Sequence, residues 1–386
     1  MEVLRTPDYN NSILNLITSI LKKYKVDTPY QGQKKLEKYM QESYDNIVLI
    51  VLDGMGDHIL KYHLPNGILH EHKIDTITSV FPSTTTAAMT TYYSGKPPIC
   101  TAWIGWSQYF KEYGRTIDLL QQKDSYTEED FECKEYSIFD MIGYETIYEQ
   151  IEKTQNAKAY EIMPDYCAPK AQQTIYANTI QESTKEIVKL CHKKEKKFIM
   201  TYLDNPDSLL HKFGCTSKEV REWLQEAEQE IEIMCKKLQG SNTLLIISAD
   251  HGHIDIKEKF DILDLTEFHE DFIMPPFLET RCISFFIKHE RKQEFKNKFV
   301  SKFKNKYRLY TKQEFFDSHL LGTGPKHRKV DDFIGDFIAV AISDTIIKLN
   351  NYYAREQKET KDKKATHCGL TKKEMEVPLI VFNLNQ

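Results

Sequence analysis

The strongest pattern in the sequence is a set of three short, uninterrupted apolar runs, each followed closely by an acidic residue. The runs cover residues 47–52, 198–203 and 243–248. The acids that follow them are Asp53, Asp207 and Asp250. Apolar runs of this length, rich in β-branched residues, are typical of strands that are buried on both faces. The pattern therefore predicts three central strands whose ends carry carboxylates.

A long amphipathic helix is predicted between the second and third of these strands. Residues 218–238 carry apolar side chains at helical spacing. Thr216 and Glu219 form a capping-box pattern at its start, and Gly240 can close its end. A strand, a helix and a strand in this order predict a parallel sheet that is covered by helices. The expected fold class is therefore α/β, with a central, mostly parallel sheet flanked by helices.

The rest of the pattern predicts one domain with two excursions. An α/β enzyme of 386 residues often folds as one body, so we expect a single catalytic domain over residues 1–386. Residues 260–321 predict a small α+β cap insertion over the site. Within it, a strand, a helix and a second strand are expected at 281–288, 292–303 and 307–310. Residues 109–194, rich in Tyr, Glu and Gln, predict helices and a partial lid.

The composition of the chain limits the classes of binding partner and the cellular compartment that we expect. The net charge is −5 and the basic residues are dispersed, so a nucleic-acid polymer is disfavoured as a partner. No apolar run reaches membrane-spanning length and the first residues do not resemble a signal peptide, so we expect a cytoplasmic protein with no membrane partner. The eight cysteines have no paired spacing, which predicts free thiols. The basic stretch Lys358 to Lys364 is expected to form a loop that gates the site.

Seven residues at or near the predicted strand ends are of types that bind divalent cations. They are Asp53, Thr85, Asp207, His211, Asp250, His251 and His367. Ligands of open α/β sheets gather at the carboxyl ends of strands, so these side chains are expected to converge. Carboxylates with imidazoles suit zinc or manganese, whereas calcium prefers oxygen ligands alone. Any one of these residues is more often a cap, a surface turn or a hydrogen-bonded histidine than a metal ligand, but the set together indicates a metal site.

A run of four hydroxyl residues supplies a candidate nucleophile. Residues 83–86 read Ser-Thr-Thr-Thr, and small residues over 86–93 predict a helix directly after them. Coordination to a divalent cation lowers the pKa of a hydroxyl, and the amides at a helix start bind anionic phosphoryl oxygens. The alternative is a Ser/Thr cluster that caps the helix, but a cap needs only one hydroxyl.

In the order of its motifs, the chain resembles the alkaline phosphatase superfamily. Within that superfamily it is most similar to the type I phosphodiesterase and nucleotide pyrophosphatase branch, from about Tyr44 to Phe382. The motifs are Leu52-Asp53-Gly54, Phe81-Pro82-Ser83-Thr84-Thr85 with Ser94-Gly95, Asp207-x-x-x-His211, Ala249-Asp250-His251-Gly252 and His367-Cys368-Gly369. The resemblance implies an alkaline-phosphatase-like three-layer fold.

The resemblance also implies a two-metal mechanism. One zinc would be bound by Asp207, His211 and His367. The other would be bound by Asp53, Thr85, Asp250 and His251. The metals are expected to be Zn²⁺, with Mn²⁺ as the alternative. Thr85 would be both ligand and catalytic nucleophile, with Ser83 and Thr84 as fallbacks, and the reaction would pass through a phosphothreonine.

Two departures from the family pattern indicate a remodelled substrate pocket. Ala88 stands where nucleotide pyrophosphatases carry an Asn that donates to the phosphoryl oxygen, and Thr101-Ala102 replaces the usual His-Gly. No Arg occurs between Thr85 and Trp106 to grip a dianionic phosphate, which favours a diester or a pyrophosphate. Thr86 and Trp106 are the candidate substrate contacts.

The predicted function is thus a two-metal hydrolase that cleaves phosphodiester or pyrophosphate bonds of small molecules such as nucleotides. The alternatives are a phosphomonoesterase or a phosphonate hydrolase that uses the same metals. A non-catalytic ligand-binding module would require lost ligands, and all seven are present. The partner expected is a small-molecule phosphate ester. The oligomeric state is left open.

Overall fold

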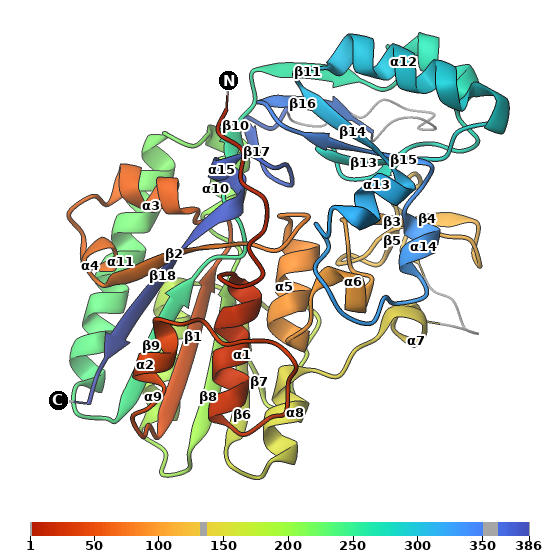
Figure 1. Cartoon of the computed structure of the whole chain (residues 1–386). Helices are drawn as coiled ribbons and strands as arrows, with labels where there is room; N and C mark the ends of the chain where they lie inside the picture. Colours follow the sequence, from red (N-terminus) through yellow and green to blue (C-terminus); the bar gives the residue numbers. More distant parts are fainter. Residues whose placement is uncertain (1, 132–136, 350–361, 386) are drawn as a thin grey trace.

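The fold is built on a seven-stranded sheet whose three central strands are the three predicted from sequence. A computed structural model describes residues 2–131, 137–349 and 362–385. The strand order is β2-β18-β9-β1-β8-β6-β7 (Figure 1). The bounds are β1 (Asn46–Leu52), β2 (Lys73–Thr78), β6 (Lys158–Met163), β7 (Thr174–Tyr176), β8 (Lys197–Leu203), β9 (Thr243–Ser248) and β18 (Glu376–Asn383). The predicted α/β fold class is confirmed.

The register of the central strands brings their carboxyl ends to one edge of the sheet. β1 pairs in parallel with β8 on one side and with β9 on the other, and Asn46 lies opposite both Lys197 and Thr243. The three strands therefore begin and end at nearly the same height along the strand direction. Every residue of β1, β8 and β9 is buried, because helices cover both faces. Only β18 runs in the opposite direction, and it pairs antiparallel with both β9 and β2.

Two helical layers cover the sheet. One layer contains α1 (Ile13–Lys23), α5 (Thr85–Ser94) and α8 (Ile147–Lys153), and the other contains α3 (Asp57–His63), α9 (Ile180–Cys191) and α11 (Lys218–Leu238) (Figure 1). The predicted helix over 218–238 is confirmed, but its N-cap is Ser217 rather than Thr216. The Ser217 side chain accepts from the Val220 amide, three residues on, as an N-cap must. Shorter helices are α2 (Leu36–Tyr39), α4 (Ile68–Glu71), α6 (Pro98–Thr101), α7 (Ile138–Ile142), α10 (Asp207–Phe213), α13 (Lys312–Asp317), α14 (Val330–Phe333) and α15 (Lys372–Met375).

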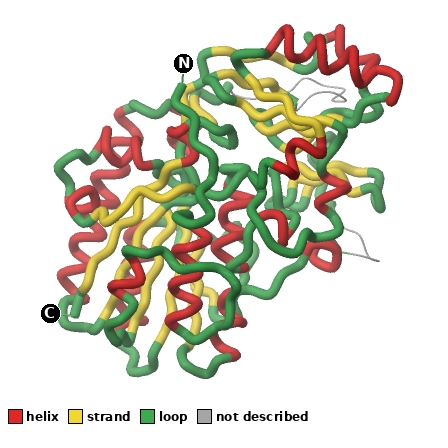
Figure 2. The backbone as a smooth tube through the Cα atoms, in the orientation of Figure 1, coloured by secondary structure: helices red, strands yellow, loops and turns green. Residues whose placement is uncertain are grey.

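A second, antiparallel sheet forms a separate layer beside the carboxyl ends of the central strands (Figures 1 and 2). Its order is β14-β15-β13-β12-β3-β4-β5. The bounds are β3 (Ser107–Phe110), β4 (Arg115–Asp118), β5 (Lys123–Asp124), β12 (Phe277–Leu278), β13 (Cys282–Phe285), β14 (Tyr307–Thr311) and β15 (Phe337–Ala341). Helix α12 (Lys292–Phe303) packs on it through three buried phenylalanines. We call this sheet, with α12, the cap sheet.

The predicted strand, helix and strand of the insertion correspond to β13, α12 and β14. The cap sheet is nevertheless wider than residues 260–321, because β15 follows that range and β3 to β5 come from residues 107–124. The described part of the range 109–194 contains the helices α7, α8 and α9, as expected. It also contributes strands to both sheets, and β6 and β7 belong to the central one. A lid function for these residues stays a prediction.

A buried ion pair joins the cap sheet to the central domain. Arg281 precedes β13, and its guanidinium donates through Nε and Nη2 to the two oxygens of Glu374, each at 2.7 Å. Both side chains are fully buried. The Gly369 amide donates to the same Glu374 carboxylate at 2.6 Å, so this joint also anchors the chain two residues after His367.

The remaining described strands are four short ones. They are β10 (Ile254–Asp255), β11 (Glu258–Asp261), β16 (Thr345–Lys348) and β17 (Ala365–Thr366). Among the described residues, no helix combines the length and apolar character needed to cross a membrane. The described cysteines are all free, as predicted, whereas a cytoplasmic location stays a prediction. Most of the predicted loop from Lys358 lies outside the described residues.

Candidate metal centre

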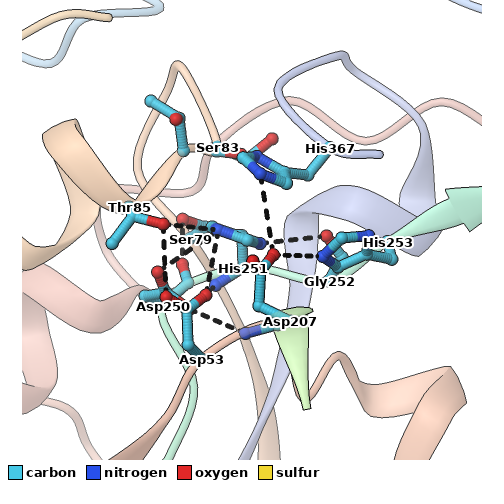
Figure 3. Close-up of polar contacts among 12 residues, drawn as sticks. Asp53, Ser79, Ser83, Thr85, Asp207, Asp250, His251, Gly252, His253 and His367 are labelled. Carbon is cyan, nitrogen blue, oxygen red and sulfur yellow. Dashed lines mark hydrogen bonds and ion pairs between the residues drawn. The ribbon is translucent and has the colours of Figure 1, made fainter. Parts of the chain in front are cut away.

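The structure brings the seven predicted ligands to one place. Asp53, Asp207 and Asp250 follow the three adjacent strands β1, β8 and β9, and His251 comes next in the chain. Thr85 starts α5, and His367 follows β17. Figure 3 shows six of these side chains pointing toward one another. Two groups have ligand atoms that all lie within 4.8 Å of one another: Asp53, Asp250 and His251, and Asp207, His251, His253 and His367.

The hydroxyl of Thr85 is the one that faces the carboxylates. Its Oγ1 lies 3.3 Å from Asp53 Oδ2 and 3.2 Å from His251 Nε2. The fallback hydroxyls point elsewhere: Ser83 donates to the carbonyl of Gly369 and Thr84 donates to Glu279. Among residues 83–85, the geometry therefore selects Thr85. The predicted helix over 86–93 is confirmed as α5, which places the first amides of a ten-residue helix beside this hydroxyl.

The carboxylates of Asp53 and Asp250 are arranged for a cation. Both are buried, and one oxygen of each, Asp53 Oδ1 and Asp250 Oδ2, has no hydrogen-bond partner among the described residues. Burial raises the pKa of both carboxyls, and at Asp53 the charges of Asp250 and Asp207 raise it further, well above its ordinary value. Buried carboxylates this close need a positive charge to stay ionised together. Divalent cations fit this requirement.

Three imidazoles are oriented as metal ligands usually are. The Nδ1 atom of His211 donates to the carbonyl of Ala365 at 2.7 Å, that of His367 to Ser83 at 3.0 Å and that of His251 to Gly252 at 3.2 Å. A carbonyl only accepts, so the proton of each neutral ring lies on Nδ1 and the lone pair on Nε2. All three Nε2 atoms lie within 3.7 Å of an aspartate oxygen in the site. Such partners fix the tautomer of metal-binding histidines.

Asp207 lies among three imidazoles. Its Oδ1 is 3.4 Å from His211 Nε2, 3.7 Å from His367 Nε2 and 2.5 Å from His253 Nε2. Burial by itself would raise the pKa of Asp207, but the three imidazoles hold it well below its ordinary value. Asp207 is thus a carboxylate ready to bind a cation.

Sequence reasoning missed His253 and Tyr202. The Tyr202 hydroxyl donates to Asp53 Oδ2 at 2.5 Å from the penultimate position of β8. The signal for Tyr202 in the sequence was a side chain with a polar hydroxyl near the end of an apolar run. For His253, the signal was a second imidazole two residues after His251.

Two glycines allow the backbone to pack tightly under the site. Gly54, directly after Asp53, has φ +75°, and a Cβ there would lie 3.0 Å from the backbone of Asp207. Its amide donates to Asp250 Oδ1 at 3.0 Å. A Cβ on Gly252 would lie 2.0 Å from the carbonyl oxygen of Lys373. These positions explain why glycine follows the Asp53 and Asp250-His251 motifs.

A cavity of about 800 Å³ opens over the site between the central domain and the cap sheet. Thr85, Asp207, His211 and His367 line its floor, and Trp106 and Glu279 lie in the wall that the cap sheet provides. Glu279 accepts from the Thr84 hydroxyl and the Trp106 amide, each at 2.8 Å. Thr86 is fully buried and is not among the residues that line the cavity. Its substrate contact, like that of Trp106, stays a prediction.

Metal binding should stabilise this protein more strongly as the pH rises. The raised pKa of Asp53 means that a proton must leave before a cation binds, whereas burial keeps the pKa of His367 well below its ordinary value. For Asp53 alone in the metal-free protein the sign is opposite: its raised pKa contributes stability that is present below its ordinary pKa and is lost as the pH rises through the folded value. Thermal unfolding with chelator and with zinc, at about pH 5.5 and about pH 8, measures the difference in Tm. An equal difference at both pH values would contradict this expectation.

The comparison of the chain with known families agrees with this geometry. The sequence profile described as type I phosphodiesterase / nucleotide pyrophosphatase matches residues 47–369. The chain belongs to this family. It is therefore a member of the alkaline phosphatase superfamily and a phosphoric ester hydrolase, and the family depends on metal ions. No match was found among curated proteins.

Solved structures share the fold over most of its length. Murine ectonucleotide pyrophosphatase / phosphodiesterase 5, in an inactive variant with AMP, superposes with a TM-score of 0.66 at 16% identity, covering 89% of this chain and 90% of that one. The human protein gives 0.65 at 15%, with 87% of each chain covered. Phosphonoacetate hydrolase from Sinorhizobium meliloti 1021, with phosphonoformate, gives 0.61 at 15%, covering 86% and 89%. These likenesses confirm the alkaline-phosphatase-like fold.

Proposed function

We propose that this enzyme uses two zinc ions to cleave phosphodiester or pyrophosphate bonds of small molecules such as nucleotides, through a phosphothreonine. The observation that carries the proposal is the position of the Thr85 hydroxyl. It faces Asp53 and His251 from the first turn of α5, while the hydroxyls of Ser83 and Thr84 are engaged elsewhere. A helix start, a hydroxyl and carboxylates at one point are what phosphoryl transfer to a side chain requires.

The ligands divide into two groups around this hydroxyl. Asp207, His211 and His367 would hold one metal, and Asp53, Thr85, Asp250 and His251 the other. The mixture of carboxylates and imidazoles favours Zn²⁺, with Mn²⁺ as the alternative. When bound, two such ions would lower the pKa of the Thr85 hydroxyl and would neutralise charge on the transferring group. The unpartnered oxygens of Asp53 and Asp250 support the assignment.

The residues then act in two displacements. Thr85 Oγ1 forms a bond to phosphorus as the bond from phosphorus to the leaving oxygen breaks. Water next attacks phosphorus, the bond to Thr85 Oγ1 breaks and the threonine hydroxyl is restored. The first amides of α5 would donate to a phosphoryl oxygen in both steps. Ala88 is fully buried in α5 and offers no side-chain donor of the kind found in the nucleotide pyrophosphatases.

The absence of arginine from the described part of the cavity lining, together with the position of Glu279, supports a diester rather than a monoester. Among the described residues that line the cavity there is no arginine to form a bidentate pair with a dianion. Lys123, Lys348 and Lys363 also line the cavity, but a lysine cannot form a bidentate pair with a phosphoryl group. The carboxylate of Glu279 lies next to the nucleophile segment and adds negative charge to the wall. A phosphodiester carries one negative charge less than a monoester at the phosphoryl group, so it meets less repulsion here.

Two chromogenic substrates test this preference. We expect bis-p-nitrophenyl phosphate to be hydrolysed with a higher kcat/KM than p-nitrophenyl phosphate, and the Glu279→Gln variant to raise the monoester rate relative to the diester rate by about 10-fold, because one like charge is removed. Steady-state kinetics of both proteins with zinc and with manganese measure the ratio. A monoester preference in the wild-type enzyme would favour the phosphomonoesterase alternative.

The size of the cavity supports a nucleotide-sized substrate. A volume of about 800 Å³ lies in the range of small-molecule sites, and Trp106 in its wall offers a surface for stacking. The murine structural relative was solved with AMP, and the Sinorhizobium relative with a phosphonate, so a phosphonate hydrolase is the second candidate. A panel of nucleotides, dinucleotides, sugar nucleotides and phosphonates, assayed with zinc and with manganese, separates the two.

A further inference from the structure

A fourth imidazole, that of His253, contacts the site without belonging to the predicted ligand set. It is fully buried, and its Nε2 lies 2.5 Å from Asp207 Oδ1. Its ring centroid lies 4.7 Å from that of His211 and 5.0 Å from that of His367. By distance alone His253 is therefore as good a candidate ligand as the others (Figure 3).

The second ring nitrogen separates His253 from the other three imidazoles. His211, His251 and His367 each donate Nδ1–H to a backbone carbonyl, which leaves the Nε2 lone pair for a metal. The Nδ1 atom of His253 is buried and has no hydrogen-bond partner among the described residues. Metal-binding histidines almost always donate their other ring N–H to a partner. A His253 bound to metal through Nε2 would bury an unpaired Nδ1–H donor, which costs about 1–3 kcal/mol.

We propose that His253 is a positioning residue rather than a metal ligand: its Nε2–H donates to Asp207 Oδ1 and holds that carboxylate in the orientation that faces His211 and His367. The inference rests on the proposed metal site. Hydrogen-bonded partners of ligating carboxylates have this role in metalloproteins.

The backbone around His253 ties together all three residues of this metal position. His253 directly precedes β10, which pairs with β17, and Ile254 lies opposite Thr366. His367 directly follows β17, and the carbonyl of Ala365 in β17 accepts from His211 Nδ1. The β10/β17 pair thus positions each of the three ligands. His367 follows β17 directly in the chain, His211 donates to the carbonyl of Ala365 in β17, and Asp207 is hydrogen-bonded to His253, which precedes β10. His253 therefore belongs to the same structural unit, the β10/β17 pair, that holds all three ligands of this metal position.

Replacing His253 by glutamine and by alanine tests the proposal. The side-chain amide of Gln can donate in place of Nε2–H but is a poor zinc ligand, whereas Ala removes both functions. Zinc affinity of each protein is measured by competition with a chromogenic chelator, and Co²⁺ replaces zinc for visible absorption spectra. We expect His253→Ala to weaken one of two metal equivalents by about 10–100-fold, and His253→Gln to recover most of that loss. The Co²⁺ spectrum of His253→Gln should match the wild-type spectrum, because the ligand atoms are the same.

The possible outcomes are distinct. If His253→Gln loses as much affinity as His253→Ala and its Co²⁺ spectrum changes, His253 is a ligand and the proposal is wrong. Unchanged affinity in His253→Ala would also overturn it. His63→Gln is the matched control, since His63 is another buried histidine whose Nε2 contacts the carbonyl of Cys215, and it should leave both metal affinities unchanged. Wild-type protein that binds fewer than two equivalents would instead count against the proposed two-metal function.

Discussion

Thr85→Ala should reduce phosphodiester hydrolysis by on the order of 10⁴-fold, because the only hydroxyl of residues 83–85 that faces Asp53 and His251 is removed. Ser83 and Thr84 should not rescue the reaction, since their hydroxyls donate to Gly369 and Glu279. Steady-state kinetics with bis-p-nitrophenyl phosphate measures the loss. A Thr85→Ala enzyme with near wild-type kcat would exclude a covalent step on this residue.

Metal analysis separates a lost nucleophile from a lost site in this variant. Six of the seven proposed ligands remain in Thr85→Ala, so we expect it to bind two metal equivalents with an unchanged fold. Thr91→Ala is the matched control, because it removes a buried threonine hydroxyl of the same helix that donates to the carbonyl of Ala87 and does not line the cavity. It should keep activity within about threefold, as expected for a residue that makes no interaction specific to the transition state. Loss of both metals in Thr85→Ala would show that the residue acts mainly in assembling the centre.

Arg281→Met should lower the free energy of unfolding by about 3–5 kcal/mol, because it leaves the buried Glu374 carboxylate without its charge partner. This is a large share of the total stability of a typical protein, about 5–15 kcal/mol. Urea unfolding of the metal-loaded protein measures the change. The effect should extend to the site, since the Gly369 amide donates to Glu374 close to His367.

A double replacement distinguishes a lost ion pair from lost packing. Arg281→Met with Glu374→Gln removes both charges together, so the double variant should be more stable than Arg281→Met alone. Lys218→Met is the surface control, because Lys218 pairs with Glu222 on the exposed side of α11 and such pairs contribute below about 1 kcal/mol. A loss below about 1 kcal/mol in Arg281→Met would mean that the joint contributes little to stability.

The central sheet could be predicted from sequence because its strands are buried on both faces. An uninterrupted aliphatic run such as that of β1 allows few other structures, and the acid after it marks the strand end. Three parallel strands with level ends then bring their acids together whatever the loops do. The convergence of Asp53, Asp207, Asp250 and His251 follows from this geometry. The other three ligands depend on elements outside these strands, because Thr85 starts α5, His211 lies in α10 and His367 follows β17.

The cap sheet could not be predicted from sequence because its strands are short and its pairings are distant in sequence. β12 and β3 meet through Leu278 and Ser107, from segments that have no shared periodicity. Leu278 has φ +92°, a conformation that is uncommon for a residue with a branched side chain and that no sequence pattern signals. The position of Glu279 in the cavity wall depends on this turn. The role of His253 likewise depends on which ring nitrogen has a partner, and only coordinates show that.

The place of β18 within the sheet has a consequence for the order in which the protein matures. This strand is near the end of the chain, yet it lies between β2 and β9, and His367 precedes it. During synthesis, the earlier strands would leave the ribosome with a gap in the sheet and an incomplete ligand set. We therefore expect a metal ion to be bound only after β18 has been translated, so that nascent chains lacking this strand do not capture metal.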